Sequence, residues 1–224
     1  MKIDLGVLHS NATEIEPFCS MAQSLGFSGI AALKPYDTPT ISFEKLRLYK
    51  RTDIRGRTIG SIRKQIDGQR KNALILSFEI GAIESTNWAI EDKRIDLLTL
   101  SFSVDHSLRD TTASLAEARG TALEVQIAPL LHTSGFNRSK ILKVYRETIE
   151  TAINNNMMIV LTSGANSPIE LRSPVAMMHI GILLGMEKHY AERAIDEIPS
   201  SIVQRNLKKM EQGYVAEGIE IVKE

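Results

Sequence analysis

The chain has 224 residues, 43% of them hydrophobic, and carries 27 basic against 27 acidic side chains, so its net charge gives no sign of a nucleic-acid partner. A single cysteine, Cys19, excludes an intrachain disulfide and a cysteine-rich zinc site. No apolar run approaches the roughly 18 residues of a membrane span, and the N-terminus shows no charged-then-apolar leader. We therefore expect one soluble, cytoplasmic domain over residues 1–224.

Short apolar runs alternate with amphipathic stretches along the chain, which is typical of a parallel sheet with crossover helices. Seven runs have the length of strands: 3–8, 29–33, 57–59, 73–78, 96–100, 123–127 and 158–161. A closed barrel of the commonest kind needs eight. Either the eighth strand lies in 38–43 or the barrel is irregular, and the sequence leaves both open.

Capping residues mark the helices. Thr13 and Glu16 form a capping box, and Gly26 ends that first helix. Asn137 is predicted to cap a helix with one inward stripe: Ile141, Leu142, Tyr145, Ile149, Ala152 and Ile153. Segments 187–197 and 200–210 are helical and nearly contiguous. We expect them to form a helical appendage over about 186–224, with Arg205, Lys208 and Lys209 on one face.

The segment 34–71 is strongly basic. It holds eleven lysines and arginines against four acids, with Tyr36, Phe43 and Tyr49 interleaved. Such a surface can neutralise phosphates and stack bases, but a solvated basic surface or a dock for an acidic protein would read the same way.

A strand end and a capped helix stand out in the C-terminal third. The apolar run 158–161 stops at Ser163-Gly164, Ser173 and Pro174 suit the N-cap and first position of a helix, and Gly185 suits its left-handed end. We expect Met178, Ile182 and Leu183 to form its inward stripe. Arg172 projects beside the helix N-terminus, where it can hold a phosphate or, alternatively, pair with Glu170 or a buried acid.

Few acids could do chemistry. Glu124 lies in the alternating run Leu123-Glu124-Val125-Gln126-Ile127, and a buried glutamate needs a cation, for which Arg138 and Arg172 are the candidates. The histidines are scattered, and no constellation with metal-ligand spacing emerges.

The elements Ser163-Gly164-Ala165, Arg172-Ser173-Pro174, Leu184-Gly185 and Arg205-Asn206 resemble the ribonuclease P protein component 3 family of archaea and eukaryotes. The resemblance covers most of the chain. It implies an α/β, TIM-barrel-like (β/α) fold related to the PHP metallo-phosphoesterases. Those enzymes carry a His-x-His element at the first strand, where this chain has only His9.

The resemblance implies a protein subunit of ribonuclease P, which removes the 5′ leader of precursor tRNA through its RNA. No catalytic residue, metal or cofactor is expected on this chain, and Mg²⁺ is expected on the RNA. The implied partners are ribonuclease P RNA, component 2 in a heterotetramer, other protein subunits and precursor tRNA, with no membrane.

The residue predictions follow from the same interpretation. The candidate RNA contacts are Lys34, Arg55, Arg57, Arg63, Lys64, Arg138, Arg172 and Arg205. The candidate structural polar residues at the barrel mouth are Asp4, Glu124, Ser163 and Asn206. Two other functions stay open: a PHP-like phosphoesterase that binds metal through Asp4, His9 and Glu124, and a purely protein-binding scaffold.

Overall fold

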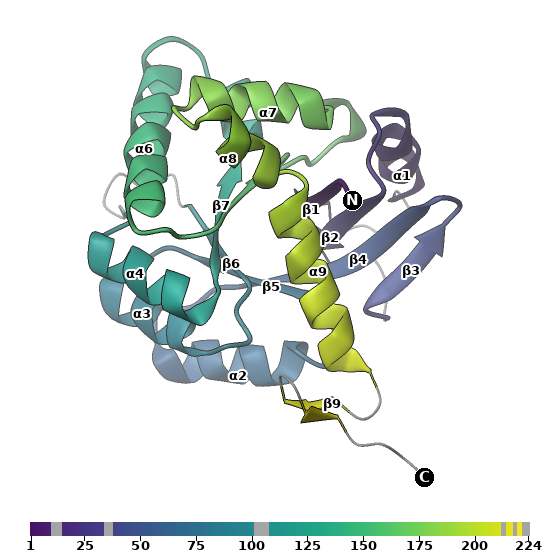
Figure 1. Ribbon diagram of the computed structural model, residues 1–224, viewed down its shortest axis with the longest axis vertical. Helices are drawn as coiled ribbons and strands as arrows, with labels where there is room; N and C mark the ends of the chain where they lie inside the picture. The colour runs from purple at the N-terminus through teal and green to yellow at the C-terminus, as the bar shows by residue number, and fades with distance from the viewer. Residues whose placement is uncertain (10–14, 34–37, 101–107, 212–213, 217–218, 221–224) are drawn as a thin grey trace.

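The structure, a computed structural model, describes residues 1–9, 15–33, 38–100, 108–211, 214–216 and 219–220 (Figure 1). The elements in chain order are β1 Ile3–Val7, α1 Ile15–Ser24, β2 Gly29–Leu33, β3 Thr40–Phe43, β4 Leu46–Ile54, α2 Ile59–Gln69, β5 Ile75–Glu79, α3 Ile83–Glu91, β6 Leu97–Thr99, α4 Asp110–Arg119, β7 Ala122–Gln126, α5 Ala128–His132, α6 Gly135–Asn154, β8 Ile159–Thr162, the 3₁₀ turn η2 Pro168–Glu170, α7 Pro174–Leu183, α8 Lys188–Arg193, α9 Glu197–Met210, β9 Tyr214–Ala216 and β10 Ile219–Glu220.

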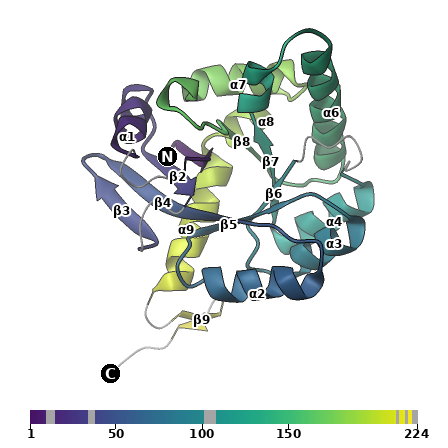
Figure 2. The same ribbon diagram turned by 180° about the vertical axis from the view of Figure 1, so that it is seen from behind.

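Seven of these strands form the wall of a nearly closed barrel. They run parallel in the order β1-β2-β4-β5-β6-β7-β8, and the helices lie around the outside (Figures 1 and 2). β3 is off this path and pairs antiparallel with β4. The TIM-barrel-like α/β prediction is confirmed, and the strand sought in 38–43 exists without becoming an eighth parallel strand.

A carboxylate closes the seam between β1 and β8, where no strand pairing is formed among the described residues. Asp4 Oδ1 accepts hydrogen bonds from the backbone N–H of Gly6 at 3.0 Å and of Ser163 at 3.1 Å. The backbone N–H of Leu8 donates to the carbonyl oxygen of Ala165 at 2.9 Å. The side chain of Asp4 therefore replaces part of the missing ladder.

One predicted strand is wrong. Residues 57–58 form a bend, and Thr58 caps α2 by accepting from Ser61 N at 3.4 Å. The strand of this region is β4, which the sequence hides because four of its nine residues are charged: Arg47, Lys50, Arg51 and Asp53. A strand can carry such residues when its charges are paired inside a barrel or face solvent.

Two helix predictions also need correction. Asn137 lies inside the first turn of α6, whose N-cap is Ser134. The predicted stripe of α7 is wrong at two of its three positions, because Ile182 and Leu183 are exposed at 36% and 58%, whereas Met178 is half-buried and packs against the core. Its buried residues are Pro174, Met177 and Gly181.

The caps of α7 are confirmed. Ser173 Oγ accepts from Ala176 N at 3.3 Å, Pro174 opens the helix, and Gly185 has φ +100°. Gly26 likewise has φ +90° after α1. Thr13 lies outside the described residues.

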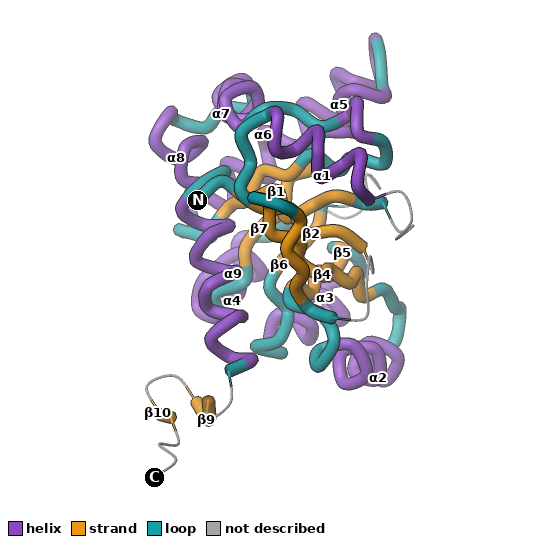
Figure 3. Tube along the Cα trace, turned by 90° about the vertical axis from the view of Figure 1, so that its right-hand side faces the viewer, coloured by secondary structure: helices purple, strands orange, loops and turns teal. Residues whose placement is uncertain are grey.

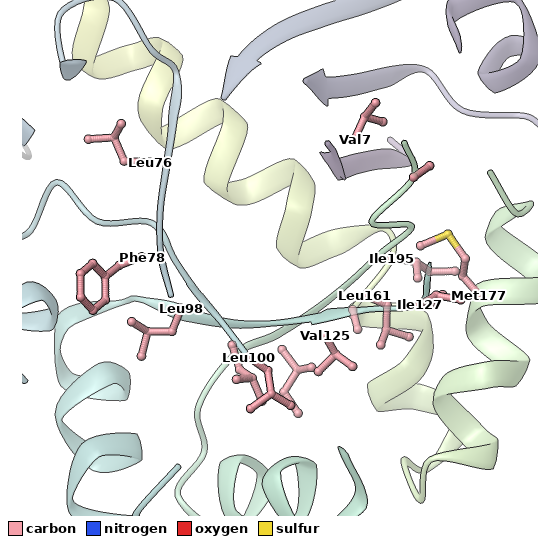
Figure 4. Packing of buried hydrophobic residues seen from close by; sticks show 14 of the residues in the cluster. Val7, Leu76, Phe78, Leu98, Leu100, Val125, Ile127, Leu161, Met177 and Ile195 are labelled. Atoms are coloured by element: carbon pink, nitrogen blue, oxygen red, sulfur yellow. The ribbon is translucent and has the colours of Figure 1, made fainter. Parts of the chain in front are cut away.

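Apolar side chains fill two separate cores. The larger lies between the barrel wall and the surrounding helices, and Figure 4 shows part of it, with Leu98, Val125 and Leu161 turned toward the helices. The smaller lies inside the barrel, where Ile3, Leu5, Tyr49 and Ile75 meet Ile198, Ile202 and Val203 of α9. The predicted segment 187–197 is the shorter helix α8, and the predicted segment 200–210 lies within α9. The break expected at 198–199 is wrong, because Pro199 stands in the first turn of α9, where proline is tolerated. Residues 214–216 and 219–220 of the expected helical appendage are the strands β9 and β10.

Helix α9 lies across the amino end of the barrel (Figure 3), and polar contacts fix it there. Arg205 donates to Asp96 Oδ1 at 3.0 Å and to the Gly120 carbonyl oxygen at 2.9 Å. Asn206 Nδ2 donates to the Leu74 carbonyl oxygen at 2.9 Å. None of the helices in the described part of the chain has the length and apolar character needed to span a membrane.

Closure of the seam predicts the effect of Gly6→Ala. A Cβ at Gly6 would meet the side-chain oxygen of Thr162 and would lie 2.6 Å from Glu124 Oε1. We expect a loss of about 3 kcal/mol in the free energy of unfolding, measured by urea denaturation. Gly60→Ala is the matched control: it lies in α2 with open space around its Cβ position and should gain up to about 1 kcal/mol. Equal stability of the two variants would contradict tight packing at the seam.

Candidate functional site

The centre of the barrel holds a buried ion pair between Arg51 of β4 and Glu124 of β7, both fully buried. Arg51 Nη1 donates to Glu124 Oε1 at 2.5 Å and Nη2 donates to Oε2 at 2.7 Å. Arg51 Nε donates to Asp53 Oδ1 at 2.7 Å, and Nη1 also donates to the Leu5 carbonyl oxygen at 2.7 Å. The guanidinium is thus bound on all sides by protein oxygens.

Hydroxyl groups complete the shell of Glu124. Thr99 Oγ1 donates to Oε2 at 2.5 Å and Thr162 Oγ1 donates to Oε1 at 2.8 Å. Ser77 contacts Thr99 in turn. Each carboxylate oxygen therefore accepts from both the arginine and a threonine, which is the condition for a buried charge to persist.

The pKa shifts follow from these contacts. Burial alone would raise the pKa of the Glu124 carboxyl, but the charge and hydrogen bonds of Arg51 outweigh it and hold that pKa below its ordinary value. Burial raises the pKa of Asp4, and the nearby charge of Glu124 adds to the rise against the opposing hydrogen bonds from Ser163 and Gly6. The barrel interior therefore favours the charged form of Glu124 and disfavours the charged form of Asp4.

The cation of Glu124 is therefore Arg51, and the predicted candidates were wrong for this role. Arg138 Nε donates to the Thr133 carbonyl oxygen at 2.7 Å, and Arg172 Nη1 donates to the carbonyl oxygens of Ile169 and Leu171. The stretch 49–53 shows no alternation of apolar and polar residues, and Tyr49, Lys50, Arg51 and Thr52 are all buried, so no local pattern identified Arg51 as an inward residue.

The three donors suggested for a phosphoesterase metal do not fit one. Asp4 binds backbone N–H groups, Glu124 binds Arg51, and the ring of His9 stacks on Phe18 with centroids 4.8 Å apart. Within the described ranges, no group of three or more histidine, cysteine, aspartate or glutamate side chains is placed to hold a metal ion.

The basic segment divides between interior and surface. Arg51 is buried, and Arg70, largely buried, pairs with Asp96 at 3.0 Å. Arg55 and Arg57 are exposed beyond the carboxyl end of β4, and Arg63 and Lys64 are exposed on α2. Gln65 Nε2 donates to the Arg55 carbonyl oxygen at 2.5 Å and ties this loop to the helix.

The other candidates lie in several places. Lys34 is outside the described residues. Arg138 is exposed on the first turns of α6, at the same end of the barrel as Arg55, whereas Arg205 and Asn206 lie at the amino end. Ser163 lies at the seam, where its Oγ accepts from Ala165 N at 3.2 Å. Glu170 pairs with His132 at 3.2 Å rather than with Arg172.

The chain matches the model of a protein family described as RNase P subunit p30 over residues 1–211. Ribonuclease P protein component 3 of Methanosarcina barkeri is 29% identical over 217 residues, which cover 94% of this chain and 90% of that protein. The component 3 protein of Methanothermobacter thermautotrophicus is 25% identical, covering 73% of this chain and 66% of its own length.

Solved structures share the fold. A chain of the cryo-EM structure of archaeal ribonuclease P with mature tRNA matches all of this chain and 99% of its own, with a TM-score of 0.83 at 20% identity. A Xaa-Pro dipeptidase with bound methionine matches 96% of this chain and 78% of its own, with a TM-score of 0.56 at 11% identity. At these identities the likeness concerns the fold alone.

The ion pair predicts a large effect of Glu124→Gln. The change leaves the buried charge of Arg51 with Asp53 as its nearest counter-ion, so we expect a loss of roughly 3 to 5 kcal/mol in the free energy of unfolding at neutral pH. Glu79→Gln, at a carboxylate that is 47% exposed and 3.9 Å from Arg55, should change it by less than about 0.5 kcal/mol. A loss below about 1 kcal/mol for Glu124→Gln would contradict a tightly coupled buried pair.

Asp4→Asn should change the pH dependence of stability. Because the pKa of Asp4 is raised above its ordinary 3.8 on folding, its stabilising contribution is complete below that value and is lost as pH rises through the folded pKa. The neutral variant keeps an acceptor oxygen for the seam. The Tm of Asp4→Asn minus the Tm of wild type should therefore increase as pH rises from 3.8 to the folded pKa of Asp4 and stay constant above it. Thermal denaturation from pH 4 to 8 measures this difference. A Tm difference that falls with rising pH would reverse the sign of the assigned shift.

Proposed function

This chain belongs to the RNase P subunit p30 family, and on that premise we propose that it supports the catalytic RNA of ribonuclease P in removing the 5′ leader of precursor tRNA. The observation that carries the proposal is the family match over residues 1–211, which is nearly the whole chain. The barrel itself supports it less, because the same fold serves unrelated activities.

We propose that the protein is a non-catalytic subunit of this endoribonuclease. The arginine and carboxylates of the barrel interior are bound to one another, so none is placed to activate water or to hold a phosphate. In this proposal the RNA performs the hydrolysis and binds the Mg²⁺, and this chain needs no cofactor of its own.

The proposed partners are the ribonuclease P RNA, precursor tRNA, component 2 in a heterotetramer, and other protein subunits. The likeness to a chain of archaeal ribonuclease P with mature tRNA supports partners of both kinds, RNA and protein. We also propose the cytoplasm as the compartment, since Cys19 is a buried free thiol.

The RNA contacts are proposed at the carboxyl end of the barrel and on α2. Arg55, Arg57, Arg63 and Lys64 are exposed close together in sequence, and the neighbouring carboxylate of Glu79 approaches only Arg55, at 3.9 Å. Arg138 is exposed at the same end of the barrel. Charges that face solvent without close counter-ions are the ones that phosphates can neutralise. Arg205, held by Asp96, is a weaker candidate.

The experiment that tests this function is leader removal by the complex isolated from native cells through the tagged chain. The isolated complex should cleave precursor tRNA, and digestion of its RNA with nuclease should abolish the activity. Activity that survives the digestion would show a protein catalyst. Failure of the isolated complex to cleave precursor tRNA would contradict the proposal that this chain is a subunit of ribonuclease P.

A charge reversal tests the RNA surface. Arg55→Glu combined with Arg57→Glu should weaken binding of ribonuclease P RNA and reduce the slope of log affinity against log salt by about 1 to 2, because phosphate contacts release counter-ions. Lys93→Glu, at an exposed lysine of the α3–β6 turn at the other end of the barrel, is the control and should leave the slope unchanged. Equal slopes for all three proteins, measured by filter binding, would place the RNA elsewhere.

A further inference from the structure

The ring of Phe136 stands out on the surface of the molecule. It is 72% exposed, whereas every other phenylalanine, tyrosine and tryptophan whose side chain the structure describes is buried or partly buried. Phe136 lies in the first turn of α6, next to the turn that joins α5 to α6 at the top of the molecule in Figure 1. The ring therefore adds little to the packing of the fold and is accessible to a partner.

A lysine holds one face of this ring. Lys140 lies one helical turn after Phe136 on the same side of α6, and its Nζ is 4.5 Å from the ring centroid. This cation–π contact orients the ring, and the exposure of the ring leaves its opposite face open to solvent. An oriented ring with one open face is a platform on which a planar aromatic group can stack.

The first three turns of α6 carry positive charge only. The sequence of residues 135–146 holds no acid and four cations: Arg138, Lys140, Lys143 and Arg146. The first acid of the helix, Glu147, lies about 16 Å along the helix axis from Phe136 and pairs with Lys143 at 3.7 Å. The carboxylate of Asp110 in α4 accepts a hydrogen bond at 2.9 Å from the residue that follows the opposite end of α6. The amino end of α6 therefore attracts anions.

The charged groups of neighbouring elements do not neutralise this end of the helix. α5 contributes His132, which pairs with Glu170 of η2 at 3.2 Å. Arg138 donates to the carbonyl oxygen of Thr133 at 2.7 Å, and this contact leaves its charge uncompensated. Among the described residues, no carboxylate lies within ion-pair distance of Arg138 or Lys140. Both charges are therefore available to phosphates.

We propose that Phe136 stacks an unpaired nucleobase of an RNA strand and that Lys140 neutralises a phosphate of the same strand. The inference rests on the proposed function, and it adds a base contact to the phosphate contacts at the carboxyl end of the barrel. The nucleotide is unpaired because bases within a duplex are stacked on one another and offer no open face.

A protein partner fits this surface less well. The residues next to Phe136 in the chain are polar and exposed: Ser134, Asn137, Arg138, Ser139 and Lys140. The centre of a protein interface buries several apolar side chains together, whereas a nucleotide presents one flat aromatic group beside a negative charge. A single ring among cations matches the nucleotide.

Phe136→Leu tests the stacking, because it keeps an apolar side chain and removes the aromatic ring. The full chain would be titrated by fluorescence anisotropy, at several salt concentrations, with an unstructured single-stranded RNA of about 12 nucleotides. We expect Phe136→Leu to bind at least fivefold more weakly with an unchanged slope of log affinity against log salt, since stacking is lost and no charge changes. Phe136→Tyr keeps a ring, and Leu183→Ala changes an apolar side chain that is 58% exposed on α7, so both should bind within twofold of wild type.

Three further measurements separate the base contact from the phosphate contact and identify the RNA. Lys140→Met should reduce the salt slope by about 0.7, the value of one phosphate contact on a single strand. An RNA of the same length whose sugars lack bases should bind wild type and Phe136→Leu equally. Ultraviolet irradiation of the isolated native complex with precursor tRNA should link a nucleotide to Phe136. Sequencing of the linked RNA shows whether that nucleotide comes from ribonuclease P RNA or from precursor tRNA.

Four results would overturn the proposal. Wild-type affinity of Phe136→Leu for the single strand, or an equal loss for the RNA without bases, would show that the ring does not stack on a base. Failure of the wild-type chain to bind the strand would contradict it too. Loss of a protein subunit from the complex isolated with Phe136→Leu, at unchanged RNA affinity, would assign the ring to a protein. None of these results bears on leader removal by the wild-type complex, whose absence would contradict the proposed function instead.

Discussion

The buried pair of Arg51 and Glu124 is the interaction on which the barrel depends. A charge enclosed by β-strands is tolerated only when its partners reach it from several sides, and here those partners come from β1, β4, β6, β7 and β8. The same requirement dictates Gly6, whose missing side chain lets β1 approach Thr162 and Glu124. The pair therefore sets strand positions and is part of the packed side chains that fill the barrel interior.

Within the described residues, the barrel interior is filled by side chains that bind or pack against one another, which favours partner contacts on the outer surface. The paired charges fill the upper part of the interior, and α9 covers the amino end with Ile198, Ile202 and Val203. Asp96 holds that cover by accepting from Arg205, Arg70 and the backbone of Leu76. On the outside, the described residues expose basic side chains near α2 and apolar side chains on α7. These two surfaces have different chemistry, as expected of a subunit that touches both RNA and protein.

Local sequence patterns predicted the alternation of strands and helices, the caps of α7 and the family, because each depends on residues close in the chain. They missed β4, because four of its nine residues are charged and such a composition predicts a surface segment. Glu124, which pairs with Arg51, lies about 73 positions away in the sequence, so no local pattern reveals that the charge is paired. They also misjudged which face of α7 is buried. Because α7 has apolar residues on both faces, its sequence shows no amphipathic periodicity. Its contact with β8 decides that Met177 and Gly181 are buried and that Ile182 and Leu183 are exposed. The buried role of Arg51 was missed because its partner Glu124 is distant in the sequence.

We would test most directly whether Arg51 and Glu124 have a structural or a catalytic role by replacing both, in the double variant Arg51→Met, Glu124→Leu. The measurement is leader removal by ribonuclease P reconstituted with this variant. Apolar residues of similar volume can replace a buried ion pair without loss of folding. Cleavage of precursor tRNA by the assembled complex should proceed at the wild-type rate, within about twofold. A complex with normal RNA and subunit content that cleaves a hundredfold more slowly would show that these buried groups take part in the chemistry.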